Sequence, residues 1–92
     1  MMKGPPASVL DQLGITDVLR VAGRPEPDRR GMIRCPSPAH RDEHPSARVQ
    51  PSGRGVRCHA CGWRGGVLDV AIALGIGHDR QSTARILGDR LR

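Results

Sequence analysis

Aromatic side chains are almost absent from this sequence: Trp63 is the single aromatic residue, and there is no Phe or Tyr. A chain of 92 residues suits one domain, and a domain this small with one aromatic ring buries little apolar surface. Because the hydrophobic core must be thin, we expect a bound metal ion to supply part of the stability.

Long apolar runs are missing as well. No stretch reaches the ~18 apolar residues of a membrane-spanning helix, and the start lacks the apolar region of a signal peptide. The three cysteines are odd in number, so a disulfide would leave one thiol over. These absences predict a cytoplasmic protein without a membrane partner, in a reducing compartment that favours metal binding over disulfides.

Lysine is scarce too, since fourteen of the fifteen basic residues are Arg. The net charge is +6, and all of the excess lies in residues 29–64, which contain eight arginines and two acids. Arginine contacts phosphate through two parallel hydrogen bonds and stacks on bases. A basic segment of this kind predicts nucleic-acid binding, with an ordinary solvated face as the alternative.

Two pairs of metal-ligating residues bracket residues 41–57: Cys35 and His40, then Cys58 and Cys61. Three thiolates and one imidazole suit tetrahedral Zn²⁺. Gly62 follows the second pair, where the chain often needs a positive φ. The residues between the pairs can form a β-hairpin that brings the two turns together. This pattern predicts a zinc ribbon with a closed, structural metal site.

Other interpretations of these residues remain open. His44 is an alternative fourth ligand, and a reduced, buried cysteine pair without metal would also fit the second pair. His59 lies between two ligands, so we expect its side chain to point away from the metal. Asp69 falls in the first turn of an expected helix, where a carboxylate suits the helix dipole better than it suits catalysis.

The periodicity of the apolar residues predicts a small α+β fold, in which helices at both ends flank a zinc ribbon with an antiparallel β-hairpin sheet. Residues 1–7 are expected to be disordered, and the domain spans residues 8–92. Thr16 or Asp17 caps the second of two short N-terminal helices, and Asp79 caps the last helix. The expected elements are helices within 8–22, the ribbon at 31–64, a helix at 66–74 that starts at Gly65-Gly66, and a helix at 79–91.

Side chains alternate between the two faces of a strand, and this rule sorts the ribbon residues. Arg34, Arg48 and Arg57 would form one basic face if the strand register permits. We therefore expect a nucleic-acid-binding surface with Trp63 as its single stacking ring. The candidate binding residues are Arg34, Arg48, Arg57, Arg64, His59 and Trp63. In the last helix, the apolar side (Ala84, Leu87 and Leu91) is the candidate docking surface for a partner.

The order of the motifs resembles one known family. The residues that carry the likeness are Cys35-Pro36, His40, Asp42-Glu43, Pro45-Ser46, Val49, Cys58-x-x-Cys61-Gly62 and Gly65-Gly66-Val67-Leu68-Asp69-Val70, preceded by Thr16-Asp17-Val18-Leu19. Together they resemble the N-terminal zinc-binding domain of DnaG-type bacterial and phage DNA primases. The likeness covers roughly residues 8 to 90, nearly the whole chain.

The resemblance implies that Cys35, His40, Cys58 and Cys61 hold zinc. It also implies that the exposed face of the ribbon contacts single-stranded template and helps a primase start an RNA primer. The implied partners are single-stranded DNA, a separate primase catalytic subunit and, as a further candidate, the replicative helicase.

Three features depart from the family pattern. The first ligand pair is Cys-x₄-His where the family has Cys-x₂-His. Ala47 and Val56 stand where the family commonly has aromatic residues. With Arg92 as the last residue, we expect no polymerase domain in this chain. The chain is therefore expected not to be catalytic alone.

The resulting hypothesis is a zinc-binding subunit of a split primase, from a phage or mobile element, that acts in trans with a catalytic chain. The alternatives are a nucleic-acid-binding zinc-ribbon regulator with no role in priming, and a purely structural interaction module.

Overall fold

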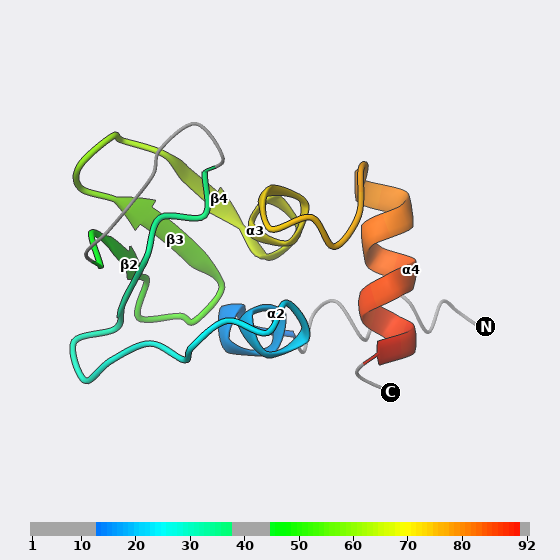
Figure 1. The fold of residues 1–92 in the computed structure, drawn as a ribbon, viewed down its shortest axis with the longest axis horizontal. Coiled ribbons are helices and arrows are strands. Elements are labelled where there is room, and N and C mark those ends of the chain that lie inside the picture. The colour runs from blue at the N-terminus through cyan, green and yellow to red at the C-terminus, as the bar shows by residue number, and fades with distance from the viewer. Residues whose placement is uncertain (1–12, 38–44, 91–92) are drawn as a thin grey trace.

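The computed structural model describes residues 13–37 and 45–90 and confirms the small α+β class. In this part of the chain, a four-stranded antiparallel sheet lies at one end of the molecule (Figure 1). Helices α2 and α3 lie next to the sheet, and α4 lies beyond them on the far side. The elements are α2 (Ile15–Val21), β1 (Met32–Ile33), β2 (Ala47–Val49), β3 (Gly55–Cys58), β4 (Arg64–Gly66), α3 (Val67–Ala73) and α4 (Arg80–Arg90).

The sheet is a simple meander, in which the strands pair in the order β1-β2-β3-β4. The hairpin between β2 and β3 turns at Gly53, whose φ of 75° lies in the region that glycine adopts without steric cost. The N–H of Gln50 donates to the carbonyl of Gly55 over 2.8 Å and closes this turn. The turn chemistry of residues 51–55 therefore forms the hairpin that the sequence indicates.

One face of the sheet is buried against the helices. Ile33, Ala47 and Cys58 stand side by side on β1, β2 and β3, and Val56 pairs with Val49 in the next row. Ile33, Ala47, Val56 and Cys58 are all buried in the same core cluster as the apolar residues of the helices. Directly opposite residues on antiparallel strands share a face, so the alternate residues point outward.

Helix α2 begins earlier than its sequence suggests. Gly14 is its N-cap residue, and Asp17 stands at the third helical position rather than at the cap. The N–H of Gly14 donates to Oδ2 of Asp17 over 2.9 Å, and the N–H of Ile15 donates to the carbonyl of Gly53 over 2.7 Å. The expected cap at Thr16 or Asp17 is wrong, because a glycine held against the hairpin turn takes that position. The expected first helix falls mostly on residues outside those described.

Residues 64–66 form a strand, β4, where the sequence indicates the start of a helix. Arg64 pairs with Arg57 and Gly66 pairs with Gly55, so β3 recruits this segment into the sheet. Helix α3 begins at the next residue, Val67. The N–H of Gly66 donates to Oδ2 of Asp69 over 2.9 Å, which satisfies one of the free donors at the helix start. Asp69 therefore has the capping role that its position favours.

Helix α4 completes the core from the far side. Leu87 is fully buried against the cluster that includes Val70 and Ala71 of α3. Oδ1 of Asp79 accepts a 2.7 Å hydrogen bond from the N–H of Ser82, as expected of a capping residue. Because Leu87 packs inside the domain, it cannot contact a partner. The prediction that Leu87 belongs to a docking surface is therefore wrong. Leu91, the third residue of that surface, lies outside the described residues.

None of the helices among the described residues is long and apolar enough to cross a membrane.

Candidate metal centre and basic sheet face

The Cys58–Cys61 segment forms a tight turn directly after β3. The carbonyl of Cys58 accepts a hydrogen bond from the N–H of Gly62 over 3.0 Å. The N–H of Cys58 donates to the carbonyl of Trp63 over 2.7 Å. Gly62 has a φ of 83°, the positive value that the sequence indicates at this position. The turn places both cysteine sulfurs on the same side of the chain, where a third cysteine meets them.

Cys35 reaches this turn from the segment that follows β1. The sulfur atoms of Cys35, Cys58 and Cys61 all lie within 4.8 Å of one another, and those of Cys35 and Cys61 are 3.7 Å apart. A disulfide would need about 2.05 Å, whereas Zn–S bonds of ~2.3 Å at a tetrahedral ion imply sulfurs ~3.8 Å apart. None of the three cysteines forms a disulfide, and their spacing fits the edges of a metal tetrahedron.

The surroundings of Cys58 favour its thiolate. Burial opposes ionisation, but hydrogen bonds from the Ser46 hydroxyl and from the N–H groups of Cys61 and Ala60 outweigh it and lower the pKa of Cys58 to about 6. The Ser46 oxygen lies 3.4 Å from the Cys58 sulfur. Cys58 is thus prepared as a ligand, because a thiolate is the form that binds metal.

Cys35 behaves in the opposite way. Burial, joined by the neighbouring Cys58 and Cys61 sulfurs, raises the pKa of the Cys35 thiol to about 12. Removing that proton would place a second negative charge beside the first in a buried site. A cation at the centre of the three sulfurs reverses this cost, since it stabilises every thiolate around it. The cluster is therefore a candidate metal site built from two buried cysteines and one exposed cysteine.

The fourth ligand stays a prediction. His40 and its alternative His44 both lie outside the described residues. His59 is not part of the cysteine cluster and is exposed, as expected for a residue that points away from the metal. Within residues 13–37 and 45–90, the three cysteines are the group of at least three side chains arranged to hold a metal ion. Soft thiolates in this number suit ions such as Zn²⁺.

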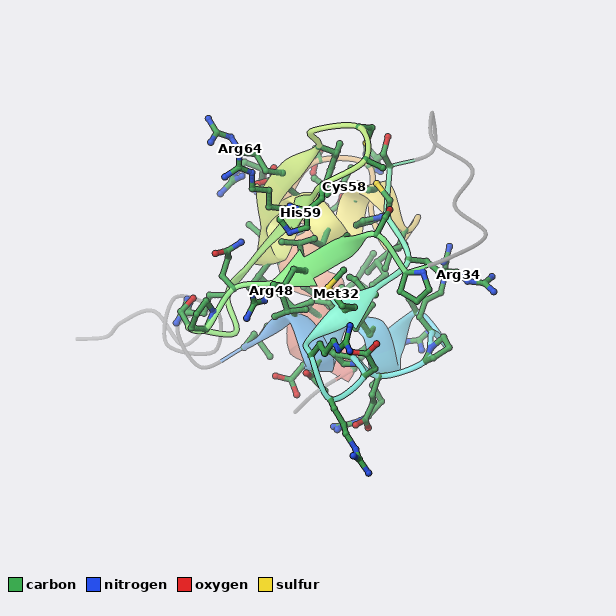
Figure 2. All side chains as sticks on the ribbon, turned by 90° about the vertical axis from the view of Figure 1, so that its left-hand side faces the viewer. Met32, Arg34, Arg48, Cys58, His59 and Arg64 are labelled. Carbon is green, nitrogen blue, oxygen red and sulfur yellow. The ribbon has the colours of Figure 1, made fainter. Side chains whose placement is uncertain are left out.

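The outward face of the same sheet carries a row of arginines. Met32 pairs with Arg48, Arg48 with Arg57, and Arg57 with Arg64, so these four residues follow one line across all four strands. The three arginines are exposed. With neighbouring strands ~4.8 Å apart, the row extends over about 14 Å. Figure 2 looks onto this face, with Met32, Arg48 and His59 near its middle and Arg64 at one edge.

This row keeps like charges side by side. Arg48, Arg57 and Arg64 make no ion pair with any other described residue, whereas Arg20 and Arg80 pair with carboxylates elsewhere in the same part of the chain. Like charges directly opposite each other destabilise a sheet. An anionic ligand that bridges the row would remove this repulsion.

The remaining predicted binding residues lie in different places. Arg34 is exposed one residue after β1 but points away from Arg48, at the opposite edge of the view in Figure 2. His59 lines a shallow hollow on the outward face together with Arg30, Met32 and Arg48. Trp63 is half-buried and packs against the core, whereas the arginines are exposed.

Sequence reasoning missed Met32 as a member of the outward face. Met32 has no charge or motif to mark it, and only the register of β1 against β2 reveals its position. The place of Arg64 in the row likewise depends on β4, which the sequence does not indicate.

Fold and site together define a small α+β domain with three cysteines that form a candidate metal site at one end of its sheet. Comparison with known proteins adds one similarity. Over 46 residues the chain is 44% identical to the "Gene 58 protein" of Mycobacterium phage D29. That match covers 50% of this chain and 36% of the phage protein, so the chain spans little more than a third of its relative. No protein-family model and no solved structure matches.

Proposed function

We propose that this chain is a zinc-binding, single-stranded-DNA-binding module that works with the catalytic chain of a DnaG-like primase when an RNA primer is started. The observation that carries the proposal is the row of Arg48, Arg57 and Arg64 beside the cysteine site. The order of motifs around the cysteines, which resembles the primase zinc domain, supplies the link to priming. The similarity to a phage protein agrees with an origin in a phage or mobile element.

The arginine row has the properties of a surface for a phosphate backbone. It is exposed, it lacks acidic partners among the described residues, and it crosses the strands in a straight line. Arginine binds phosphate oxygens by paired, charge-assisted hydrogen bonds. We therefore infer that a single strand lies along the row, across the direction of the β-strands.

The metal site and this surface meet on β3. Arg57 points outward from β3, and Cys58, the next residue, points inward to the sulfur cluster. Three cysteines with a histidine would complete a closed site that holds β3 in place but takes no part in chemistry. In this proposal the zinc fixes the shape of the DNA-binding face.

Stimulation of priming follows from positioning. Starting a primer requires two nucleotides and a template to meet before any product duplex holds them. A module that binds the template beside the catalytic chain lowers the entropic cost of that encounter. Because no acidic metal cluster occurs among the described residues, the catalytic carboxylates in this proposal belong to the partner chain.

The test is a primer-synthesis assay with labelled nucleotides, in which this protein is added to a DnaG-type catalytic fragment that lacks a zinc domain. Initiation should rise with added protein and saturate, while elongation of a pre-made primer changes little. The double variant Arg57→Ala/Arg64→Ala should abolish the rise. Arg85→Ala/Arg90→Ala, which removes the same charge from exposed positions on α4, should not.

Two results would contradict the proposal. If initiation and elongation respond equally, or if neither responds at any concentration, the chain has no specific role in priming. Binding of single-stranded DNA without any effect on initiation would instead support a regulator that binds nucleic acid.

A further inference from the structure

A shallow hollow lies on the outward face of the sheet, at the end of the arginine row. It has a volume of about 430 Å³. Gly55 of β3 and Gly66 of β4 stand directly opposite each other, two pairs along from Arg57 and Arg64 and therefore on the same face. The residues that line the hollow are Gln50, Gly55, Val56, Arg57, Arg64, Gly65 and Gly66.

The fold does not require glycine at the two floor positions. A Cβ at Gly55 would come no closer than 3.5 Å to another atom, and a Cβ at Gly66 no closer than 3.7 Å, which are ordinary contacts. Neither residue has a positive φ. Gly65 differs, because its Cβ would lie 2.5 Å from Cβ of Asp69. Gly55 begins β3 and Gly66 ends β4, and glycine in a strand is one way to leave room for a ligand beside the backbone.

Two polar groups of the floor are already engaged. The carbonyl of Gly55 accepts a hydrogen bond from the N–H of Gln50, and the N–H of Gly66 donates to Asp69. The Gly66 N–H is therefore not available to donate to a phosphate, whereas a planar ring can lie on the peptide groups without a donor. The Gln50 side chain stands at the rim, 3.5 Å from the position of a Gly55 Cβ, and its amide can both donate and accept.

We propose that this hollow is a subsite for one base of a bound single strand. The base lies flat on the peptide groups of Gly55 and Gly66, and its flanking phosphates contact Arg57 and Arg64. The Gln50 amide hydrogen-bonds the edge of the base. The inference rests on the proposed binding of single-stranded DNA and adds where a base is held. It also gives the domain a stacking surface that does not depend on Trp63, whose ring packs against the core.

The experiment uses fluorescence anisotropy with two labelled probes: a twelve-nucleotide oligothymidylate, and an abasic oligonucleotide of the same length and charge. The variant Gly55→Ala/Gly66→Ala adds two methyl groups to the floor of the hollow. It should bind oligothymidylate about tenfold more weakly, within the range for losing one stacked base, and bind the abasic probe as the wild type does. Gly88→Ala, in open space on α4, should match the wild type with both probes.

The readouts separate this inference from the proposed function. Equal binding of oligothymidylate by wild type and Gly55→Ala/Gly66→Ala, or equal losses on both probes, overturns the base subsite. If Arg57→Ala/Arg64→Ala still weakens binding of both probes in that case, the phosphate surface stands without the subsite. Absence of binding to either probe by the wild-type protein overturns both. Each single Gly→Ala variant should show part of the loss while keeping the wild-type melting temperature.

Discussion

The two faces of the sheet use neighbouring residues for different purposes. On the inward face, Ile33, Ala47, Val56 and Cys58 are 6% exposed or less and belong to the core. On the outward face, Arg48, Arg57 and Arg64 are exposed and have no ionic partner among the described residues. A strand alternates its side chains, so every step of one residue changes the face.

This difference implies that single substitutions can change the stability of the fold and the proposed nucleic-acid binding separately. Changes on the inward face should act on unfolding, and changes on the outward face should act on nucleic-acid affinity. The following predictions test that separation, beginning with the largest expected effect.

Loss of a cysteine ligand should destroy both faces together. Cys58→Ser removes a buried thiolate from the metal cluster, and structural zinc contributes on the order of 10 kcal/mol to small domains, comparable to their total stability. Elemental analysis should find little bound zinc, and thermal melting should lose its cooperative transition. The neighbouring His59→Ala is the control and should keep both. A Cys58→Ser protein with full metal content would refute the assigned site.

Truncation of an inward apolar residue should destabilise the fold while the outward face stays intact. Ile33→Ala opens space beside Ala47 and should reduce the free energy of unfolding by about 2–5 kcal/mol. Arg48→Ala, on the paired strand but exposed, should change it by no more than about 0.5 kcal/mol. Urea titrations of the zinc-bound proteins measure both values. Equal destabilisation by the two variants would mean that the outward row supports the fold.

The two adjacent glycines of β4 should respond differently to the same substitution. Gly65→Ala forces a Cβ against the side chain of Asp69 and should cost about 1–3 kcal/mol. Gly66→Ala meets only ordinary contacts and should leave the unfolding free energy within about 0.5 kcal/mol of the wild type. Thermal melting followed by circular dichroism distinguishes them. A reversed order would show that the strand register is wrong.

Single outward arginines should affect the salt dependence of binding more than stability. Arg57→Ala should flatten the plot of log affinity against log salt by about 0.7 for single-stranded DNA, the value for one phosphate contact. Melting temperature should stay the same or rise slightly, because a like-charge neighbour of Arg48 and Arg64 is removed. Titrations at several salt concentrations provide the slope. An unchanged slope would place the strand elsewhere on the domain.

Much of the fold could be predicted because its signals are local. The Cys58–Cys61 turn followed by a glycine, the hairpin turn near Gly53 and the cap at Asp79 all depend on residues within a few positions of one another. The alternation of β2 and β3 likewise identifies the inward residues. The structure brings the three cysteines together as their spacing indicates, and the fourth ligand stays a prediction.

The remainder depends on contacts between distant segments. Strand β4 contains two glycines, which weaken any local strand signal, and it exists because it pairs with β3. The start of α2 at Ile15 depends on the hydrogen bond that its N–H donates to the carbonyl of Gly53 in the hairpin turn. Trp63 directly precedes β4, so the face of the sheet on which its side chain lies also depends on this pairing. Sequence alone could place arginines on strands but could not align Arg64 with Arg57.

The direct passage from β4 to α3 has a mechanical consequence. The strand ends at Gly66 and the helix begins at Val67, so no linker residue separates them. A rotation of the sheet edge relative to the helix has no loop to absorb it. A force applied at Arg64 is therefore transmitted to α3 through hydrogen-bonded backbone. If DNA binds along the arginine row as proposed, a force on the bound strand would therefore act directly on the packing of α3 against the core.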